Sequence, residues 1–97
     1  MAGQRPAPNE RRTAYYSGHV QGVGFRATVS RLAQQFEVSG FVRNLSDGRV
    51  EVVVEGAAAE LQRFLTAIAE RMEGHIRQVT VDVRPAIGEF TEFEIRS

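Results

Sequence analysis

The apolar positions of the chain recur with two different periods. Between residues 25 and 36, and again between about residues 58 and 72, apolar side chains recur every three or four positions. This spacing is typical of one face of a helix. The pattern therefore predicts two helices, each with one buried face. The members of the two stripes are Phe25, Val29, Leu32, Ala33 and Phe36, followed by Leu61, Phe64, Leu65, Ile68 and Met72.

Other segments indicate strands. Alternation with a period of two marks residues 49–55, 79–84 and 92–96, and apolar or aromatic content marks residues 11–17 and 40–45. We expect Glu51 and Glu55 to face outward. The residues that we expect to face inward are Val50, Val52, Val54, Val79, Val81, Val83, Phe93 and Ile95.

The order of these elements is β-α-β-β-α-β with one additional terminal strand. One-sided helices and alternating strands favour an antiparallel sheet with helices on one face and water on the other. The predicted fold class is therefore α+β, a ferredoxin-like split βαβ sandwich with four or five antiparallel strands and two helices on one face. Residues 1–10 are polar and contain two prolines, Pro6 and Pro8. We interpret them as a flexible tail before a domain at 11–97.

Composition narrows the range of functions. The chain has 97 residues, no cysteine, and 12 basic against 12 acidic side chains. The length fits one domain, and zero net charge disfavours an electrostatic nucleic-acid binder. The lack of cysteine excludes disulfides and thiolate zinc sites. No apolar run approaches the roughly 18 residues of a membrane span, and the N-terminus has no secretory pattern. We therefore expect a cytoplasmic protein.

The stretch GHVQGVGFR, residues 18–26, lies between a predicted strand and a predicted helix. Backbone N–H groups of such a loop and of a helix N-terminus favour the binding of an anion. The guanidinium of Arg26 adds two parallel donors for the oxygens of that anion. The stretch lacks the lysine and hydroxyl pair of a Walker A loop and the third glycine of a dinucleotide loop. The loop therefore indicates a small anion and not a nucleotide, while a plain turn stays open as an alternative.

Two motifs in the chain resemble those of the acylphosphatase family. The family's first motif is V-Q-G-V-x-F-R, and its second runs from a Gly-aromatic pair through an asparagine to G-x-V and a final glycine. The resemblance covers roughly residues 11–97. The matching residues are Val20, Gln21, Gly22, Val23, Phe25 and Arg26 for the first motif, and Gly40, Phe41, Val42, Arg43, Asn44, Gly48, Val50 and Gly56 for the second.

The resemblance implies an enzyme that hydrolyses the carboxyl-phosphate bond of acyl phosphates to a carboxylate and inorganic phosphate. The resemblance implies that Arg26 and the N–H groups of the loop bind the phosphoryl group and that Asn44 holds the attacking water. It also implies that no metal or cofactor takes part. His19 lies where the family varies. The implied phosphate-binding loop consists of Val20, Gln21, Gly22, Val23, Gly24, Phe25 and Arg26.

Two alternatives stay open. The first is a non-catalytic or carbamoyl-phosphate-processing module, because domains of this family also occur within larger proteins. Since nothing follows Ser97, we expect a free-standing enzyme. We expect an isolated small domain of this kind to be monomeric, and the lack of a long apolar run predicts no membrane partner. The second is an RNA-binding module with the same element order. The segment RVEVVVEG carries valine and glutamate where such a module needs aromatic and basic side chains, so we expect no nucleic-acid partner.

Overall fold

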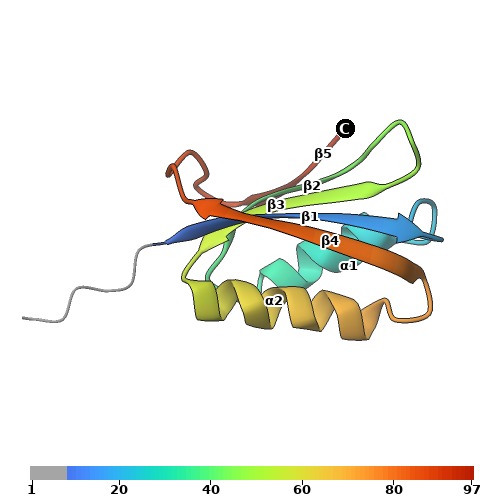
Figure 1. The fold of residues 1–97 in the computed structure, drawn as a ribbon, viewed down its shortest axis with the longest axis horizontal. Helices are drawn as coiled ribbons and strands as arrows, with labels where there is room; N and C mark the ends of the chain where they lie inside the picture. Colours follow the sequence, from blue (N-terminus) through green and yellow to red (C-terminus); the bar gives the residue numbers. More distant parts are fainter. Residues whose placement is uncertain (1–8) are drawn as a thin grey trace, which may run out of the picture.

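The computed structural model describes residues 9–97, in which two helices pack on one face of a sheet (Figure 1). This arrangement confirms the predicted α+β, ferredoxin-like fold. Residues 1–8 of the expected tail lie outside the described residues, and Glu10 already belongs to the first strand. The elements are β1 (Glu10–Gly18), α1 (Phe25–Ala33), β2 (Ser39–Asn44), β3 (Val50–Gly56), α2 (Ala58–Arg71), β4 (Ile76–Pro85) and β5 (Phe93–Arg96).

The sheet has five strands in the order β4-β1-β3-β2-β5. The pairs β4–β1, β1–β3 and β3–β2 are antiparallel, as predicted, but β5 runs parallel to β2. The prediction of a wholly antiparallel sheet is therefore wrong. The reason lies in residues 86–92, which lead from one edge of the sheet to the other, so that β5 begins beside the start of β2. Figure 1 shows this crossing above the sheet.

Both predicted apolar stripes form the core between sheet and helices. The Phe25 ring of α1 lies against Tyr16 of β1, with ring centroids 5.1 Å apart. The Phe64 ring of α2 lies against Phe93 of β5, with centroids 5.7 Å apart. These tilted and edge-on ring contacts stabilise the fold beyond the burial of apolar surface alone. The core thus joins the helices to an inner strand and to one edge strand of the sheet.

Both helices end earlier than the stripes predict. Hydrogen bonds of the i→i−3 type replace the α-helical ones over residues 34–36, so α1 ends at Ala33. Phe36 therefore packs from a turn and not from the helix, yet its ring centroid still lies 5.7 Å from that of Phe64. Likewise, α2 ends just before Met72, which is buried at the C-cap. An apolar stripe indicates which side chains are buried and not where the helix ends, because burial continues past the last helical turn.

The two edge strands are less buried than predicted. Val81 pairs with buried Ala14, which confirms that the valines of β4 face the helices. Val79, Val81 and Val83 nevertheless keep 44%, 47% and 52% of their surface exposed, and Ile95 of β5 keeps 46%. The helices thus cover the edge strands only in part, although Phe93 of β5 is buried against Phe64 of α2. The prediction of the face is therefore right, and the prediction of burial at these positions is wrong.

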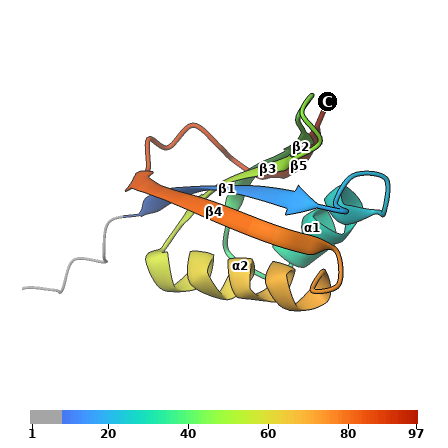
Figure 2. The same cartoon turned by 45° about the vertical axis from the view of Figure 1, so that its right-hand side comes forward.

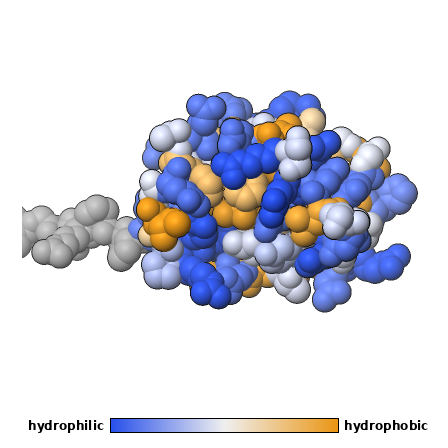
Figure 3. Space-filling view, turned by 90° about the horizontal axis from the view of Figure 1, so that it is seen from above, coloured by the Kyte–Doolittle hydropathy of each residue, from blue (hydrophilic) through white to orange (hydrophobic). Residues whose placement is uncertain are grey.

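The face of the sheet opposite the helices is less open to water than predicted. Glu51 and Glu55 of β3 lie on this face but are only 7% and 5% exposed. The Arg43 Nε atom lies 2.6 Å from the Glu51 carboxylate, and residues 86–92 lie close to Glu55. In the view from above, polar side chains surround smaller apolar areas (Figure 3). Ion pairs and the connecting segment therefore cover the middle of this face.

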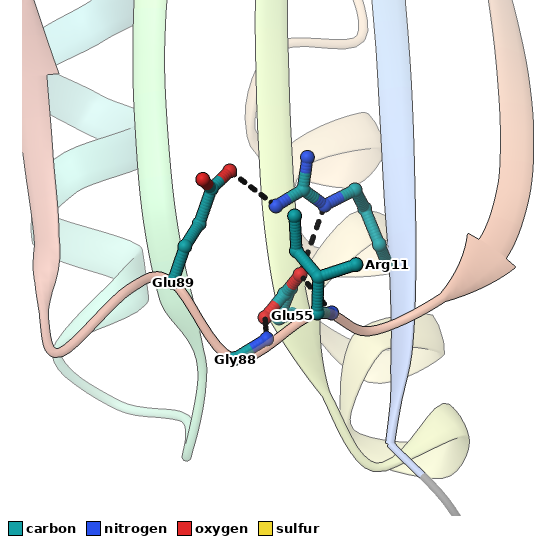
Figure 4. Close-up of polar contacts among 5 residues, drawn as sticks. Arg11, Glu55, Gly88 and Glu89 are labelled. Atoms are coloured by element: carbon teal, nitrogen blue, oxygen red, sulfur yellow. Dashed lines mark hydrogen bonds and ion pairs between the residues drawn. The ribbon is translucent and has the colours of Figure 1, made fainter.

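Glu55 lies at the centre of a cluster of hydrogen bonds (Figure 4). It is bonded to Arg11, Ile87 and Gly88, and Arg11 in turn donates to Glu89. The Glu55 carboxylate accepts from Arg11 Nε at 2.9 Å and from the N–H groups of Ile87 and Gly88 at 3.0 Å each. Burial by itself raises the pKa of the Glu55 carboxyl, but these hydrogen bonds and the charge of Arg11 outweigh it and hold the pKa below its ordinary value. The cluster fixes the segment between β4 and β5 on the sheet.

The Glu55→Gln substitution is expected to lower the free energy of unfolding at pH 7 by about 1–3 kcal/mol, because hydrogen bonds to a charged acceptor are lost. A carboxyl whose pKa is lowered by folding stabilises fully above its unfolded pKa of about 4.3 and loses this contribution as the pH falls through the folded value. The difference between wild type and variant therefore shrinks below about pH 4. Urea denaturation at a series of pH values measures it.

Glu94→Gln is the matched control, since Glu94 pairs with Arg96 at an exposed site. Exposed pairs contribute little to stability, about 0–1 kcal/mol. We expect this variant to follow the wild type across the pH series. A Glu55→Gln difference that stays constant from pH 7 to pH 3 would contradict the assignment.

Candidate active site

The loop at residues 19–24 joins β1 to α1 at the end of the sheet where the β2–β3 hairpin also lies (Figures 1 and 2). Its start is held against the α2–β4 connection. Gly18 has a φ of +121°, and a Cβ atom there would lie 2.6 Å from the His75 carbonyl oxygen, so glycine permits this close approach. The His19 N–H donates to the same oxygen at 2.8 Å. The start of the loop is therefore anchored to the connection between α2 and β4.

Two further glycines give the loop its shape. Gly22 and Gly24 have φ values of +77° and +78°, and a Cβ at either position would meet no atom within 4 Å. Glycine is therefore favoured there by the left-handed backbone and not by lack of space. Gly24 is the N-cap of α1, and the first turn of this helix contains no acidic residue. The N–H groups of this turn thus present a positive helix end that no side-chain carboxylate of the turn neutralises.

A pocket of about 210 Å³ opens at this helix end. It is formed by the loop, by the first turn of α1, and by the neighbouring strands β2 and β5. Residues distant in sequence, such as Arg26 and Asn44, thereby come to one site. The residues that line the pocket are Val20, Gly22, Gly24, Phe25, Arg26, Ala27, Asn44 and Ile95.

Most of the predicted loop residues line this pocket, but Gln21 and Val23 do not. The Gln21 side chain instead donates to the β2–β3 hairpin, and Val23 packs against the core. Val20 and Phe25 are only 1% exposed, so their side chains form the floor of the pocket. Backbone groups, glycines and Arg26 therefore make up most of what the loop presents to a ligand.

Ala27 and Ile95 line the pocket although sequence reasoning did not place them there. Ala27 directly follows Arg26 in the first helical turn, so its position could have been inferred from the predicted helix start. Ile95 was expected as an inward-facing core residue. It reaches the pocket because β5 pairs in parallel with β2, the strand that carries Asn44. No feature of the sequence predicted that pairing.

Arg26 and Asn44 carry the polar chemistry of the pocket. Within residues 9–97, neither side chain has a hydrogen bond or ion pair to another residue, and both are half-buried. By contrast, Arg11 and Arg43 on the opposite face each pair with a glutamate. A guanidinium beside the positive end of a helix, with no carboxylate partner, favours an anion. The arrangement can hold a phosphate-sized group next to an amide.

The two histidines lie outside this pocket. The rings of His19 and His75 are side by side, with centroids 6.3 Å apart, on the exposed surface. In residues 9–97 no three side chains of the metal-binding types come together. Nor does this part of the chain contain a helix long and apolar enough to cross a membrane.

Comparison with known proteins gives consistent results for family and fold. The sequence model of the acylphosphatase family matches residues 12–95. An acylphosphatase of Paenarthrobacter aurescens is 42% identical over 86 residues, which cover 88% of this chain and 92% of that protein. An acylphosphatase of Deinococcus radiodurans is 46% identical over 74 residues, or 76% of this chain and 84% of the other.

Solved structures are similar as well. The crystal structure of acylphosphatase from Bacillus subtilis superposes with a TM-score of 0.81 at 29% identity, covering 91% of this chain and 99% of that chain. Full-length HypF in the phosphate- and nucleotide-bound form gives a TM-score of 0.79 at 28% identity, covering 98% of this chain but 12% of that chain. The motifs, the family match and the relatives of similar length lead to one conclusion: the chain belongs to the acylphosphatase family of hydrolases.

Proposed function

We propose that the chain hydrolyses the carboxyl-phosphate bond of acyl phosphates through Arg26, the N–H groups of loop 19–24 and the start of α1, and Asn44. The observation that carries the proposal is the pocket in which Arg26, without a carboxylate partner in residues 9–97, lies beside Asn44 at the N-terminus of a helix. Arg26 and the backbone groups bind the phosphoryl oxygens. Asn44 holds the water that attacks phosphorus.

The leaving group explains why this pocket needs no nucleophilic or acidic side chain. The bond that breaks joins phosphorus to a carboxyl oxygen, and the electron pair stays on that oxygen. A carboxylate is the conjugate base of an acid with a pKa of about 4, so it leaves without being protonated. Phosphoryl transfer has a loose transition state in which the protein mainly positions groups and stabilises charge. Preorganised donors such as Arg26 and backbone N–H groups supply that stabilisation.

Asn44 suits the positioning of a neutral water molecule. Its amide offers both a donor and an acceptor, so it can orient one water without removing a proton from it. The oxygen of this water forms the new bond to phosphorus, in line with the bond that breaks. Its proton passes to a phosphoryl oxygen of the substrate. The products are a carboxylate and inorganic phosphate.

A second candidate is an anion-binding module that acts on carbamoyl phosphate within a larger assembly. The similarity to part of the HypF structure, which was solved with phosphate and nucleotide bound, supports this second candidate. Nucleic-acid binding is not part of the proposal, because the segment RVEVVVEG of β3 carries valine and glutamate where such a module needs aromatic and basic side chains. The monomeric state and the cytoplasmic location stay predictions.

The test is release of inorganic phosphate from benzoyl phosphate by the purified chain. We expect release well above the spontaneous rate, and we expect none from phenyl phosphate, whose phenoxide leaving group has a conjugate-acid pKa of about 10 and needs protonation. Thermal stabilisation by inorganic phosphate measures binding separately. Thermal stabilisation by phosphate without turnover of benzoyl phosphate supports the anion-binding module. Absence of both stabilisation and turnover contradicts the proposed site.

A further inference from the structure

Gln21 belongs to the phosphate-binding loop, yet its side chain lies against a different part of the molecule. The single nitrogen of its amide, Nε2, donates to the Leu45 carbonyl oxygen at 2.8 Å and to the Arg49 carbonyl oxygen at 2.9 Å. An amide nitrogen carries two hydrogens, and both have partners here. Neither is left for a substrate, and Gln21 does not line the pocket.

The two acceptors lie at the base of the β2–β3 hairpin. Leu45 directly follows Asn44, and its own N–H donates to the Arg49 carbonyl oxygen at 2.8 Å. The Gln21 amide therefore bridges both ends of the hairpin at the residue next to Asn44. Gln21 thereby links the loop that precedes Arg26 to the strand end that carries Asn44.

We infer that Gln21 is a positioning residue that sets the distance between the phosphoryl group on the loop and the water on Asn44. The inference rests on the proposed function, in which these two groups react with each other. They are held by different elements, and the loop contains two glycines at positive φ, Gly22 and Gly24, which leave its backbone permissive. Reaction rates respond strongly to such distances, since a misplacement of about 1 Å can cost roughly a hundredfold.

The Gln21→Met substitution keeps the length of the side chain and removes both donors. We expect kcat for benzoyl phosphate to fall by roughly tenfold to a hundredfold. The inhibition constant of inorganic phosphate is expected to change by less than about threefold, because Arg26 and the backbone groups that bind phosphate are retained. Gln62→Met is the matched control, since the exposed Gln62 amide of α2 donates to Thr66 and accepts from Arg12, neither of which lines the pocket, and we expect wild-type kinetics.

A double-mutant cycle with Asn44→Ala distinguishes positioning from a general structural role. If Gln21 acts by placing the phosphoryl group relative to Asn44, its substitution has no further effect once the Asn44 amide is gone. We therefore expect Gln21→Met/Asn44→Ala to have the kcat of Asn44→Ala within about twofold. Losses that multiply in the double variant overturn the inference.

Gln21→Glu provides a second variant in case the methionine variant does not fold. An ionised carboxylate opposite two carbonyl oxygens donates no hydrogen bond, whereas a protonated carboxyl donates one. Its kcat relative to wild type is expected to rise as the pH falls toward the carboxyl pKa. A flat ratio, or wild-type kcat in either variant, overturns the inference. An inactive wild-type chain contradicts the proposed function instead, so the two failures are distinguishable.

Discussion

Arg26→Ala is expected to lower kcat/KM for benzoyl phosphate by about a thousandfold, because the guanidinium is the one cationic side chain among the pocket-lining residues within 9–97. The charge that develops on the phosphoryl oxygens then has only backbone N–H groups as partners. Competitive inhibition by inorganic phosphate is expected to disappear in the same variant. Initial rates at several phosphate concentrations measure both effects.

Arg31→Ala is the matched control for this experiment. Arg31 lies on the same helix but in its last turn, is exposed, and donates to Thr28. We expect this variant to keep wild-type rates and wild-type inhibition by phosphate. If a folded Arg26→Ala variant retained even a tenth of the wild-type kcat/KM, Arg26 would not be the phosphoryl-binding cation.

Asn44→Ala is expected to lower kcat by about 10²- to 10³-fold while leaving inhibition by inorganic phosphate nearly unchanged. The amide is assigned to water, and the phosphate-binding groups are on the loop and α1. This separation of kcat from phosphate affinity distinguishes Asn44 from Arg26, whose loss affects both. Steady-state kinetics with phosphate as inhibitor measure the two quantities together.

Asn44→Asp serves as a control of similar shape. Its carboxylate would face the negative phosphoryl group, so we expect activity at least as low as that of the alanine variant, with weaker binding of phosphate as well. A folded Asn44→Ala variant with wild-type kcat would contradict the assigned role. An Asn44→Ala variant whose affinity for phosphate falls as much as its kcat would also contradict this role.

Local patterns predicted the elements of this fold more accurately than their surroundings. The stripes of Phe25 and Phe64 identified both helices because a helix buries the side chains that recur every three or four positions. Alternation identified β4 and β5, and it also indicated which way Val81 and Ile95 point. It could not indicate that both strands lie at edges of the sheet, since exposure depends on which strands and helices pack beside them.

The candidate site was predictable in part for the same reason. Glycines between a strand and a helix, followed by Arg26, indicated a small anion, and the resemblance of two motifs added Asn44 and the acyl phosphate. Gln21 was expected to contribute to the loop. Its hydrogen bonds reach Leu45 and Arg49, which are 24 and 28 residues away, and no local pattern reports contacts at such a separation.

The most direct test of the account is hydrolysis of benzoyl phosphate by the wild-type chain in water enriched in oxygen-18, followed by mass spectrometry of both products. Attack by the Asn44-bound water on phosphorus places one labelled oxygen in inorganic phosphate and none in benzoate. We expect that distribution. Label in benzoate, which indicates attack on the carbonyl carbon, or no hydrolysis above the spontaneous rate, would contradict it.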